Sequence, residues 1–154
     1  MLMDPKLVGY LRRALNHEMA AVQQYLTQAT LCELWGLDDA AAKFQHESVD
    51  ELEHAKRLTR YLLTLGIVPN GAQLPAVQRV RSLRDMLMAD WHLEAEAVQL
   101  YSDASLYCTR VQDDTAYHLF AGLLEEEQAH LKDVESWLDD LAASESQQNG
   151  ARHV

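Results

Sequence analysis

The chain contains an internal duplication that appears when its sequence is displaced by 76 positions onto itself. The displacement pairs identical residues that can bind metal ions: Glu18 with Glu94, Glu51 with Glu127, and His54 with His130. The flanking sequence repeats too, since Tyr25 falls on Tyr101 and Phe44 on Phe120. The duplication predicts two helix pairs that face each other across a pseudo-twofold axis. Four carboxylates and two imidazoles with that symmetry suit two divalent transition-metal ions in a helical bundle.

Length and composition predict a single soluble domain. The chain has 154 residues, 48% of them hydrophobic and 24% charged, which is enough to bury a real core. No apolar run approaches the roughly 20 residues that span a bilayer. Residues 1–5 lack the basic and apolar pattern of a secretory signal. We therefore expect a cytoplasmic protein without a membrane segment.

The charge balance excludes nucleic acid as a partner. Thirteen Lys and Arg residues against 24 Asp and Glu residues give a formal net charge of -11, which repels phosphate backbones and attracts cations. Cys32 and Cys108 form no CxxC motif, so we interpret them as reduced core thiols and not as metal ligands.

Capping and helix-breaking residues predict two long helices in the first half of the chain. Asp4 followed by Pro5 begins the first helix, which ends before Gly36. Asp38 or Asp39 is expected to cap the second helix, which continues to residues 62–66.

Two further helices are predicted in the second half. Ser82 and Asp85 resemble a capping box for the third helix, which continues to about Val111. The fourth restarts at residues 113–115. Beyond Ala143 the apolar periodicity stops, so residues 1–143 are predicted to form the bundle and residues 144–154 a flexible polar tail.

The connector at residues 66–81 predicts the topology. Helices of this length are roughly 45 Å long, and a connector of 16 residues spans about 50 Å when extended. It can therefore return along the whole bundle. We predict an all-α fold with two antiparallel helix pairs joined by one long crossover, which is the ferritin-like four-helix bundle.

The candidate ligands interrupt apolar stripes, so they are predicted to point into the core. Glu127 and His130 lie in phase with the apolar residues of the fourth helix, and Glu51 and His54 lie at the same phase on the second helix. Glu18 and Glu94 lie on the apolar faces of the first and third helices. Burying one unpaired carboxylate costs several kcal/mol. Two divalent ions would cancel the charge of four carboxylates, while neutral imidazoles add nitrogen ligands.

Each half contains a Glu-x-x-His motif, 33 residues after an inward glutamate. This spacing puts both side chains on adjacent turns of one helix face, so that both approach one ion. The alternative, exposed glutamates and merely packed histidines, requires six coincident positions on apolar stripes. Zinc also fits the ligand set, but carboxylate-rich pairs favour iron or manganese.

The chain resembles a bacterioferritin up to about Leu141. Besides the candidate ligands, the resemblance rests on shared motifs, among them Gln24-Tyr25, Trp35-Gly36-Leu37, His46-Glu47-Ser48, Asp50-Glu51, His54-Ala55 and Trp137-Leu138. It implies a ferroxidase with two non-haem iron ions per subunit, in which O2 or H2O2 oxidises Fe(II) to Fe(III). It also implies iron storage as a mineral inside a homo-oligomeric shell of about 24 subunits.

The resemblance assigns roles to individual residues. It implies six iron ligands, with Glu51 and Glu127 as bridges: Glu18, Glu51, His54, Glu94, Glu127 and His130. Tyr25 matches a tyrosine that can supply an electron, and it also suits a core phenol bonded to a ligand carboxylate. Tyr101 lies outside the usual pattern, and we expect a packing role for it. His46 and Asp50 match a pair that binds iron on the inner cavity surface.

Other positions modify these expectations. Asp90 and Glu126 are expected beside ligand histidines, because metal-bound imidazoles usually donate to a carboxylate. Leu52 replaces a haem-ligating methionine of the family, so haem is not expected through this residue. Haem would need a methionine-bearing subunit in a mixed shell, or another ligand. The tail beyond Ser144 is too polar to resemble the short fifth helix of bacterioferritins.

Two alternative functions use the same pattern. A rubrerythrin-like di-iron peroxide reductase fits the pairing of Tyr25 with Tyr101. It is disfavoured by the missing four-cysteine domain and by Ala97, where a further inward glutamate is expected. A non-catalytic shell subunit is the second alternative, and six inward polar groups disfavour it.

Overall fold

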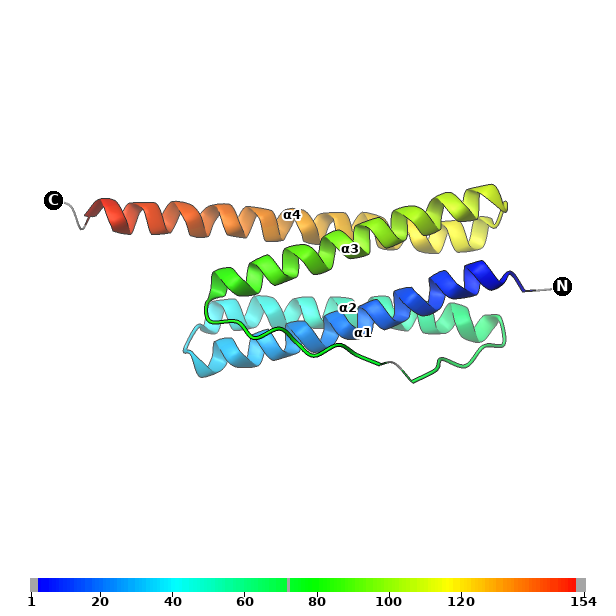
Figure 1. Ribbon diagram of the computed structural model, residues 1–154, viewed down its shortest axis with the longest axis horizontal. Coiled ribbons are helices and arrows are strands. Elements are labelled where there is room, and N and C mark those ends of the chain that lie inside the picture. Colours follow the sequence, from blue (N-terminus) through cyan, green and yellow to red (C-terminus); the bar gives the residue numbers. More distant parts are fainter. Residues whose placement is uncertain (1–2, 72, 152–154) are drawn as a thin grey trace.

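The computed structural model describes residues 3–71 and 73–151, which form four helices (Figure 1). These are α1 (Pro5–Leu34), α2 (Asp38–Thr64), α3 (Leu83–Arg110) and α4 (Asp114–Ala151). Helix α1 packs antiparallel to α2, and α3 packs antiparallel to α4. The connector between α2 and α3 runs back along the bundle (Figure 1). The predicted all-α bundle with a long crossover is confirmed. None of the described helices is long and apolar enough to cross a membrane.

The predicted ends of the first two helices are mostly correct. The Asp4 side chain accepts hydrogen bonds from the backbone N–H groups of Lys6 at 2.9 Å and Leu7 at 3.4 Å. Gly36 and Gly66 follow the ends of α1 and α2 with φ of 74° and 76°, a conformation that favours glycine.

The predicted cap of α2 is wrong, because Leu37 occupies the N-cap position without a side-chain cap bond. Asp38 and Asp39 instead lie in the first helical turn. Their negative charges there stabilise the helix through its dipole and not through a capping bond.

The third and fourth helices begin with capping bonds. Ser82 Oγ accepts from the Asp85 N–H at 3.1 Å, whereas the Asp85 carboxylate accepts from the Arg81 N–H. Only half of the predicted capping box therefore forms. Asp113 caps α4 by accepting from the Ala116 N–H at 2.9 Å.

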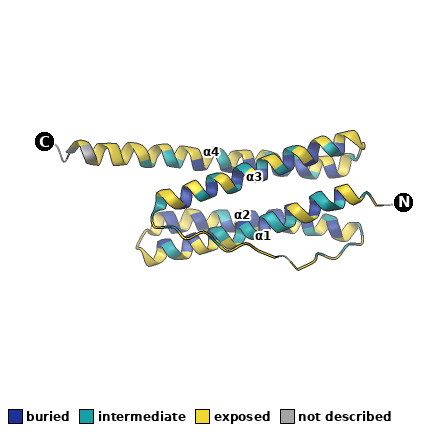
Figure 2. Cartoon of the chain, viewed as in Figure 1, coloured by how far each residue is buried: buried dark blue, intermediate teal, exposed yellow. Residues whose placement is uncertain are grey.

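Helix α4 is longer than the sequence pattern predicts. The expected irregular tail beyond Ala143 is wrong as far as Ala151, since the helix continues to that residue and extends past the bundle (Figure 2). Residues 142–148 are exposed, so backbone hydrogen bonds and the helix propensity of Ala, Glu and Gln maintain this segment without burial. Residues 152–154 of the expected tail lie outside the described residues. The flexibility of the segment stays a prediction.

The buried apolar side chains form two clusters, one at each end of the bundle. One cluster contains Leu11, Leu58 and Phe120, and the other contains Phe44 and Leu87. Cys32 and Cys108 are free and buried, one in each cluster. The polar centre lies between the clusters, so both ends of the bundle exclude water from it.

We predict that Gly66→Ala lowers the free energy of unfolding by about 1–2 kcal/mol, because a Cβ disfavours the left-handed conformation at this residue. Gly122→Ala is the matched control within α4, where an added methyl group would meet no atom of the described residues within 4 Å. It should raise the free energy of unfolding by about 0.5–1 kcal/mol. Urea denaturation measures both values, and equal effects of the two substitutions would contradict this account of the α2 terminus.

Candidate metal centre

Six polar side chains lie in the middle of the bundle, and each helix contributes at least one of them. Their exposed fractions range from 0% to 9%. They are Glu18 on α1, Glu51 and His54 on α2, Glu94 on α3, and Glu127 and His130 on α4. Each lies at helical spacing from apolar core residues of the same helix face, so packing of those residues turns the polar groups inward.

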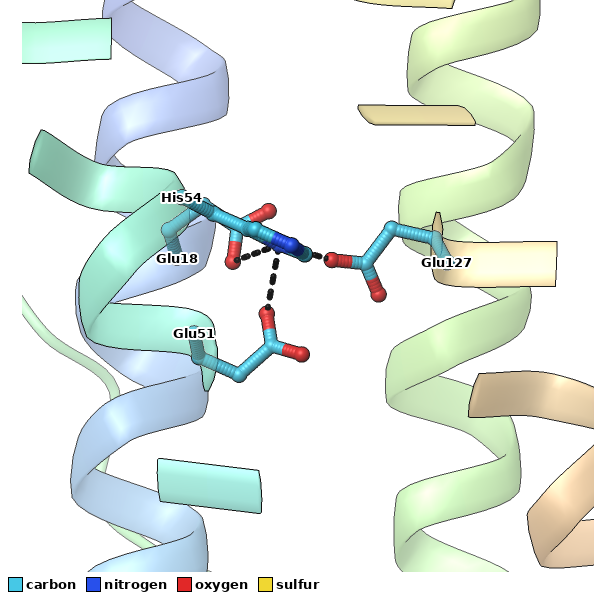
Figure 3. Close-up of side chains that lie close together, drawn as sticks. All are labelled: Glu18, Glu51, His54 and Glu127. Carbon is cyan, nitrogen blue, oxygen red and sulfur yellow. Dashed lines mark hydrogen bonds and ion pairs between the residues drawn. The ribbon is translucent and has the colours of Figure 1, made fainter. Parts of the chain in front are cut away.

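His54 is the centre of the first group of these side chains (Figure 3). Its Nδ1 atom lies 2.6 Å from Glu127 Oε1, 3.5 Å from Glu51 Oε2 and 3.6 Å from Glu18 Oε2. The four residues offer ligand atoms that all lie within 4.8 Å of one another. This spacing allows one metal ion to be bound by three carboxylates and one imidazole.

His130 is the centre of a second group. Its Nδ1 atom lies 2.8 Å from Glu51 Oε1, 3.5 Å from Glu127 Oε2 and 3.9 Å from Glu94 Oε1. The potential ligand atoms of Glu47, Glu51, Glu94 and His130 also lie within 4.8 Å of one another. The two imidazole rings are 5.7 Å apart, centroid to centroid. Two ions can therefore occupy neighbouring positions.

Glu51 and Glu127 have the geometry of bridging ligands. Each directs one carboxylate oxygen towards His54 and the other towards His130. Glu18 lies near His54, and Glu94 near His130. Glu51 and Glu127 can therefore be shared by both metal positions, whereas Glu18 and Glu94 can each serve only one.

Several polar atoms in this centre are buried without a hydrogen-bond partner among the described residues. They are Glu18 Oε2, Glu47 Oε2, Glu51 Oε1, Glu127 Oε2 and His130 Nδ1. His130 Nδ1 and Glu51 Oε1 are only 2.8 Å apart, but they are not aligned as a hydrogen bond. Buried polar atoms normally find partners, so a cation is the ligand whose chemistry fits these atoms.

Burial divides the four carboxyl groups into two pairs. Burial, followed by the neighbouring Glu51, raises the pKa of Glu18 well above its ordinary value. Burial and Glu127 do the same to the pKa of Glu94. Burial also raises the pKa of Glu51 and Glu127, but the adjoining acid groups Glu18 and Glu94 and the two histidines outweigh burial and lower both. At neutral pH we expect protons on Glu18 and Glu94, and charges on the other two.

The two histidines carry the balancing positive charge. Burial lowers the pKa of His54, but its hydrogen bond to Glu127 and the nearby carboxyl groups of Glu18 and Glu51 outweigh it and raise the pKa to about 12. The same competition raises the pKa of His130 to about 11. Two imidazolium groups thus balance two carboxylates. Two divalent ions would replace four protons without changing the net charge of the centre.

Two tyrosines bond the outer carboxylates of the centre. The Tyr25 hydroxyl on α1 donates to Glu94 Oε1 on α3 at 2.5 Å. The Tyr101 hydroxyl on α3 donates to Glu18 Oε1 on α1. The packing role expected for Tyr101 is therefore incomplete, because its hydroxyl has a specific partner within the centre.

Two more carboxylates lie behind the histidines. Glu126 Oε2 is 3.5 Å from His54 Nε2 and accepts a hydrogen bond from Arg57 at 2.5 Å. Asp50 Oδ2 is 3.5 Å from His130 Nε2 and also 3.5 Å from His46 Nε2. Asp50 and Glu126 are 76 positions apart, so the duplication extends to this outer layer.

Asp90 and Glu47 differ from the sequence predictions. Asp90 accepts a hydrogen bond from Gln24 at 2.8 Å, and its expected place beside a ligand histidine is wrong because its carboxylate faces α1. Glu47 was missed, although its Oε2 lies 3.5 Å from His130 Nδ1. The position of Glu47 one helical turn before Glu51 could have indicated that it faces the centre. The duplication gives no such indication, because the equivalent residue in the other half is Leu123.

A cavity of about 510 Å³ connects this centre with the surface between α2 and α4. It reaches Tyr25 and His130, and its walls include the acidic residues Glu47, Asp90 and Asp133. Lys43 also lines the cavity, and burial raises the pKa of Asp90 to about 7, but the acidic residues, with Asp140, outnumber the lysine and favour cations over anions. Small molecules and metal ions can therefore approach the centre from this side.

Comparison with known proteins places this arrangement in a family. A family model described as a ferritin-like domain matches residues 8–144. The bacterioferritin of Rhodobacter capsulatus is 32% identical over 133 residues, which cover 86% of this chain and 83% of the relative. The Brucella melitensis bacterioferritin is 30% identical over 139 residues, covering 90% and 86%. The Mycobacterium avium bacterioferritin is 29% identical over 136 residues, covering 88% and 86%.

The family model covers nearly the whole bundle, including the positions of all six inward residues. The chain therefore belongs to the ferritin-like domain family, and within it to the bacterioferritin-like proteins. This membership supports a role in iron storage.

We predict that binding of two Co(II) ions per chain at pH 7 releases about four protons, two from imidazolium groups and two from the carboxylic acids. Co(II) affinity should consequently rise with pH, because the protonated groups must lose their protons to bind metal. Titration calorimetry in buffers with different ionisation enthalpies measures the release. In the comparison variant His54→Gln, which lacks one imidazolium group, the number of protons released should fall by one. Metal binding without proton release would contradict the charge balance described above.

Proposed function

We propose that the protein is a ferroxidase that oxidises Fe(II) to Fe(III) at a dinuclear site, with O2 or H2O2 as the electron acceptor. The observation that supports this most is the convergence of four buried carboxylates and two imidazoles, with several polar atoms that have no hydrogen-bond partner among the described residues. Membership of the ferritin-like family supports iron as the metal.

The donor atoms favour an exchangeable ion with redox chemistry. Both groups consist of carboxylate and imidazole ligands, whereas structural zinc sites prefer thiolate and imidazole. Each Fe(II) ion supplies one electron. Two electrons and two protons convert H2O2 to two water molecules, or O2 to H2O2.

The protein's own residues hold the two iron ions close together and balance their charge. Glu51 and Glu127 would bridge the ions, and His54 and His130 would each bind one of them through Nδ1. Glu18 and Glu94 would complete one position each. Because the charged ligands are fixed before the reaction, little reorganisation accompanies electron transfer. Glu47, next to His130, is a further acidic group for an ion that arrives or leaves.

The cavity between α2 and α4 is the route that we propose for iron. His46, whose side chain is 74% exposed, and Asp50 lie on the outer side of His130. They would bind iron between the dinuclear site and the mineral. The formal net charge of -11 raises the concentration of cations around the chain.

We propose a homo-oligomeric shell for storage of the mineral. Bacterioferritins are the relatives that match most of this chain. Leu52 on α2 is 53% exposed, so it is available to a partner subunit, but its side chain has no atom that can ligate haem. Haem would require a methionine-bearing partner in a mixed shell, or another ligand.

A rubrerythrin-like peroxide reductase is the second candidate function. The hydrogen bonds from Tyr25 to Glu94 and from Tyr101 to Glu18 favour this function, because they give both halves of the centre the same phenol contact. Ala97 is buried in the position expected for a further glutamate, which disfavours it. A non-catalytic subunit leaves the six inward polar groups without a purpose.

We expect Glu18→Ala and His130→Ala to slow Fe(II) oxidation by more than about 100-fold, because each removes a metal ligand. Loss of a residue that only supports a ligand typically costs about 10- to 100-fold, and loss of the ligand itself should cost more. Stopped-flow absorbance of aerobic Fe(II) mixtures measures the initial rate. Glu53→Ala, which removes an exposed carboxylate next to His54, is the control and should retain the rate. Wild-type rates in both ligand variants would reject the ferroxidase assignment.

Native mass distinguishes the two candidate functions. A storage shell of about 24 chains of 17.5 kDa has a mass of roughly 420 kDa. A dimer that consumes H2O2 without retaining an iron mineral would favour the peroxide reductase.

A further inference from the structure

Tyr101 and Tyr25 form a crossed pair around the centre. Tyr101, on α3, is 0% exposed and donates its hydroxyl hydrogen to Glu18 on α1. Tyr25, on α1, is 1% exposed and donates to Glu94 on α3 at 2.5 Å. Each phenol therefore reaches from one half of the duplication to a carboxylate of the other half.

Buried aromatic neighbours hold both phenol rings in place. The Tyr25 ring centroid lies 6.3 Å from that of Phe44, and the Tyr101 centroid lies 6.1 Å from that of Phe120. Phe44 and Phe120 are also paired by the duplication and are 1% and 0% exposed. Close packing restricts the rotamers of both tyrosines, so their hydroxyl groups have fixed positions.

The hydrogen bond from Tyr101 determines which oxygen of Glu18 remains for a metal ion. Oε1 accepts from the phenol, whereas Oε2 has no hydrogen-bond partner among the described residues and lies 3.6 Å from His54 Nδ1. In each bond the phenol O–H is the donor and a carboxyl oxygen is the acceptor.

The two bonded carboxylates belong to different metal positions. Glu18 is in the group around His54, and Glu94 is in the group around His130. The bridging carboxylates Glu51 and Glu127 contact both histidines. The tyrosines thus act on the two ligands that distinguish one position from the other.

We propose that Tyr101 is a positioning residue that sets the affinity of the His54 metal position by leaving Oε2 of Glu18 free. We propose that Tyr25 sets the affinity of the His130 position in a different way, because Glu94 Oε1 both accepts from Tyr25 and faces His130 at 3.9 Å. The inference rests on the proposed dinuclear site. A packing role alone needs only the aromatic ring of Tyr101, whereas this role needs its hydroxyl. Loss of a hydrogen bond to a ligand typically weakens metal binding 10- to 100-fold.

Anaerobic Co(II) titration tests the pair, with Tyr101→Phe and Tyr25→Phe as matched variants. Both keep the ring that packs against Phe120 or Phe44, and circular dichroism of the metal-free chains checks the fold. Each variant should raise the dissociation constant of one of the two Co(II) ions about 10- to 100-fold and leave the other near its wild-type value. The double variant should weaken both.

Anomalous diffraction at limiting Co(II) identifies the weakened position. Tyr101→Phe should lower the occupancy beside His54, and Tyr25→Phe the occupancy beside His130. Unchanged binding of both ions in Tyr101→Phe, or equal weakening of both positions, would overturn the inference while leaving the dinuclear site intact. Failure of the wild-type chain to bind two Co(II) ions would instead overturn the proposed function.

Discussion

Charge balance in the middle of the bundle is the constraint on which the structure depends. Four carboxyl groups are almost completely buried there, and burial of unpaired charge costs several kcal/mol per ion. The chain can meet this constraint with protons on Glu18 and Glu94 and with two imidazolium groups. Two divalent ions meet it equally well. The same side chains therefore balance their charge in the folded chain and offer ligand atoms with the spacing that two cations need.

The duplication of the fold places the balancing groups symmetrically in the two halves of the bundle. Each half contributes a helix with one outer carboxylate and a helix with a bridging carboxylate and a histidine. The long crossover lets α3 and α4 pack against α1 and α2, so that the two halves face each other (Figure 1). The tyrosines and the outer carboxylates Asp50 and Glu126 extend the symmetry beyond the ligands. Symmetry fails at Glu47, which adds acidity near His130 alone.

Sequence reasoning predicted the bundle and all six inward residues, because the duplication and the helical periodicity are both long-range patterns. It missed Glu47 because Leu123 occupies the equivalent position in the other half. Features that depend on local geometry were less predictable. Asp38 lies in the first turn of α2 and not at its cap, and α4 continues to Ala151 on helix propensity without apolar periodicity. The partner of Asp90 depends on a side-chain direction that spacing does not determine.

Anomalous diffraction from crystals soaked anaerobically with Fe(II) tests the central claim most directly. The account predicts two iron peaks about 3.5–4 Å apart, between His54 and His130, each bound by an imidazole Nδ1 and joined by Glu51 and Glu127. Iron found only at exposed carboxylates, with the six inward side chains unchanged and no peak between His54 and His130, would contradict it.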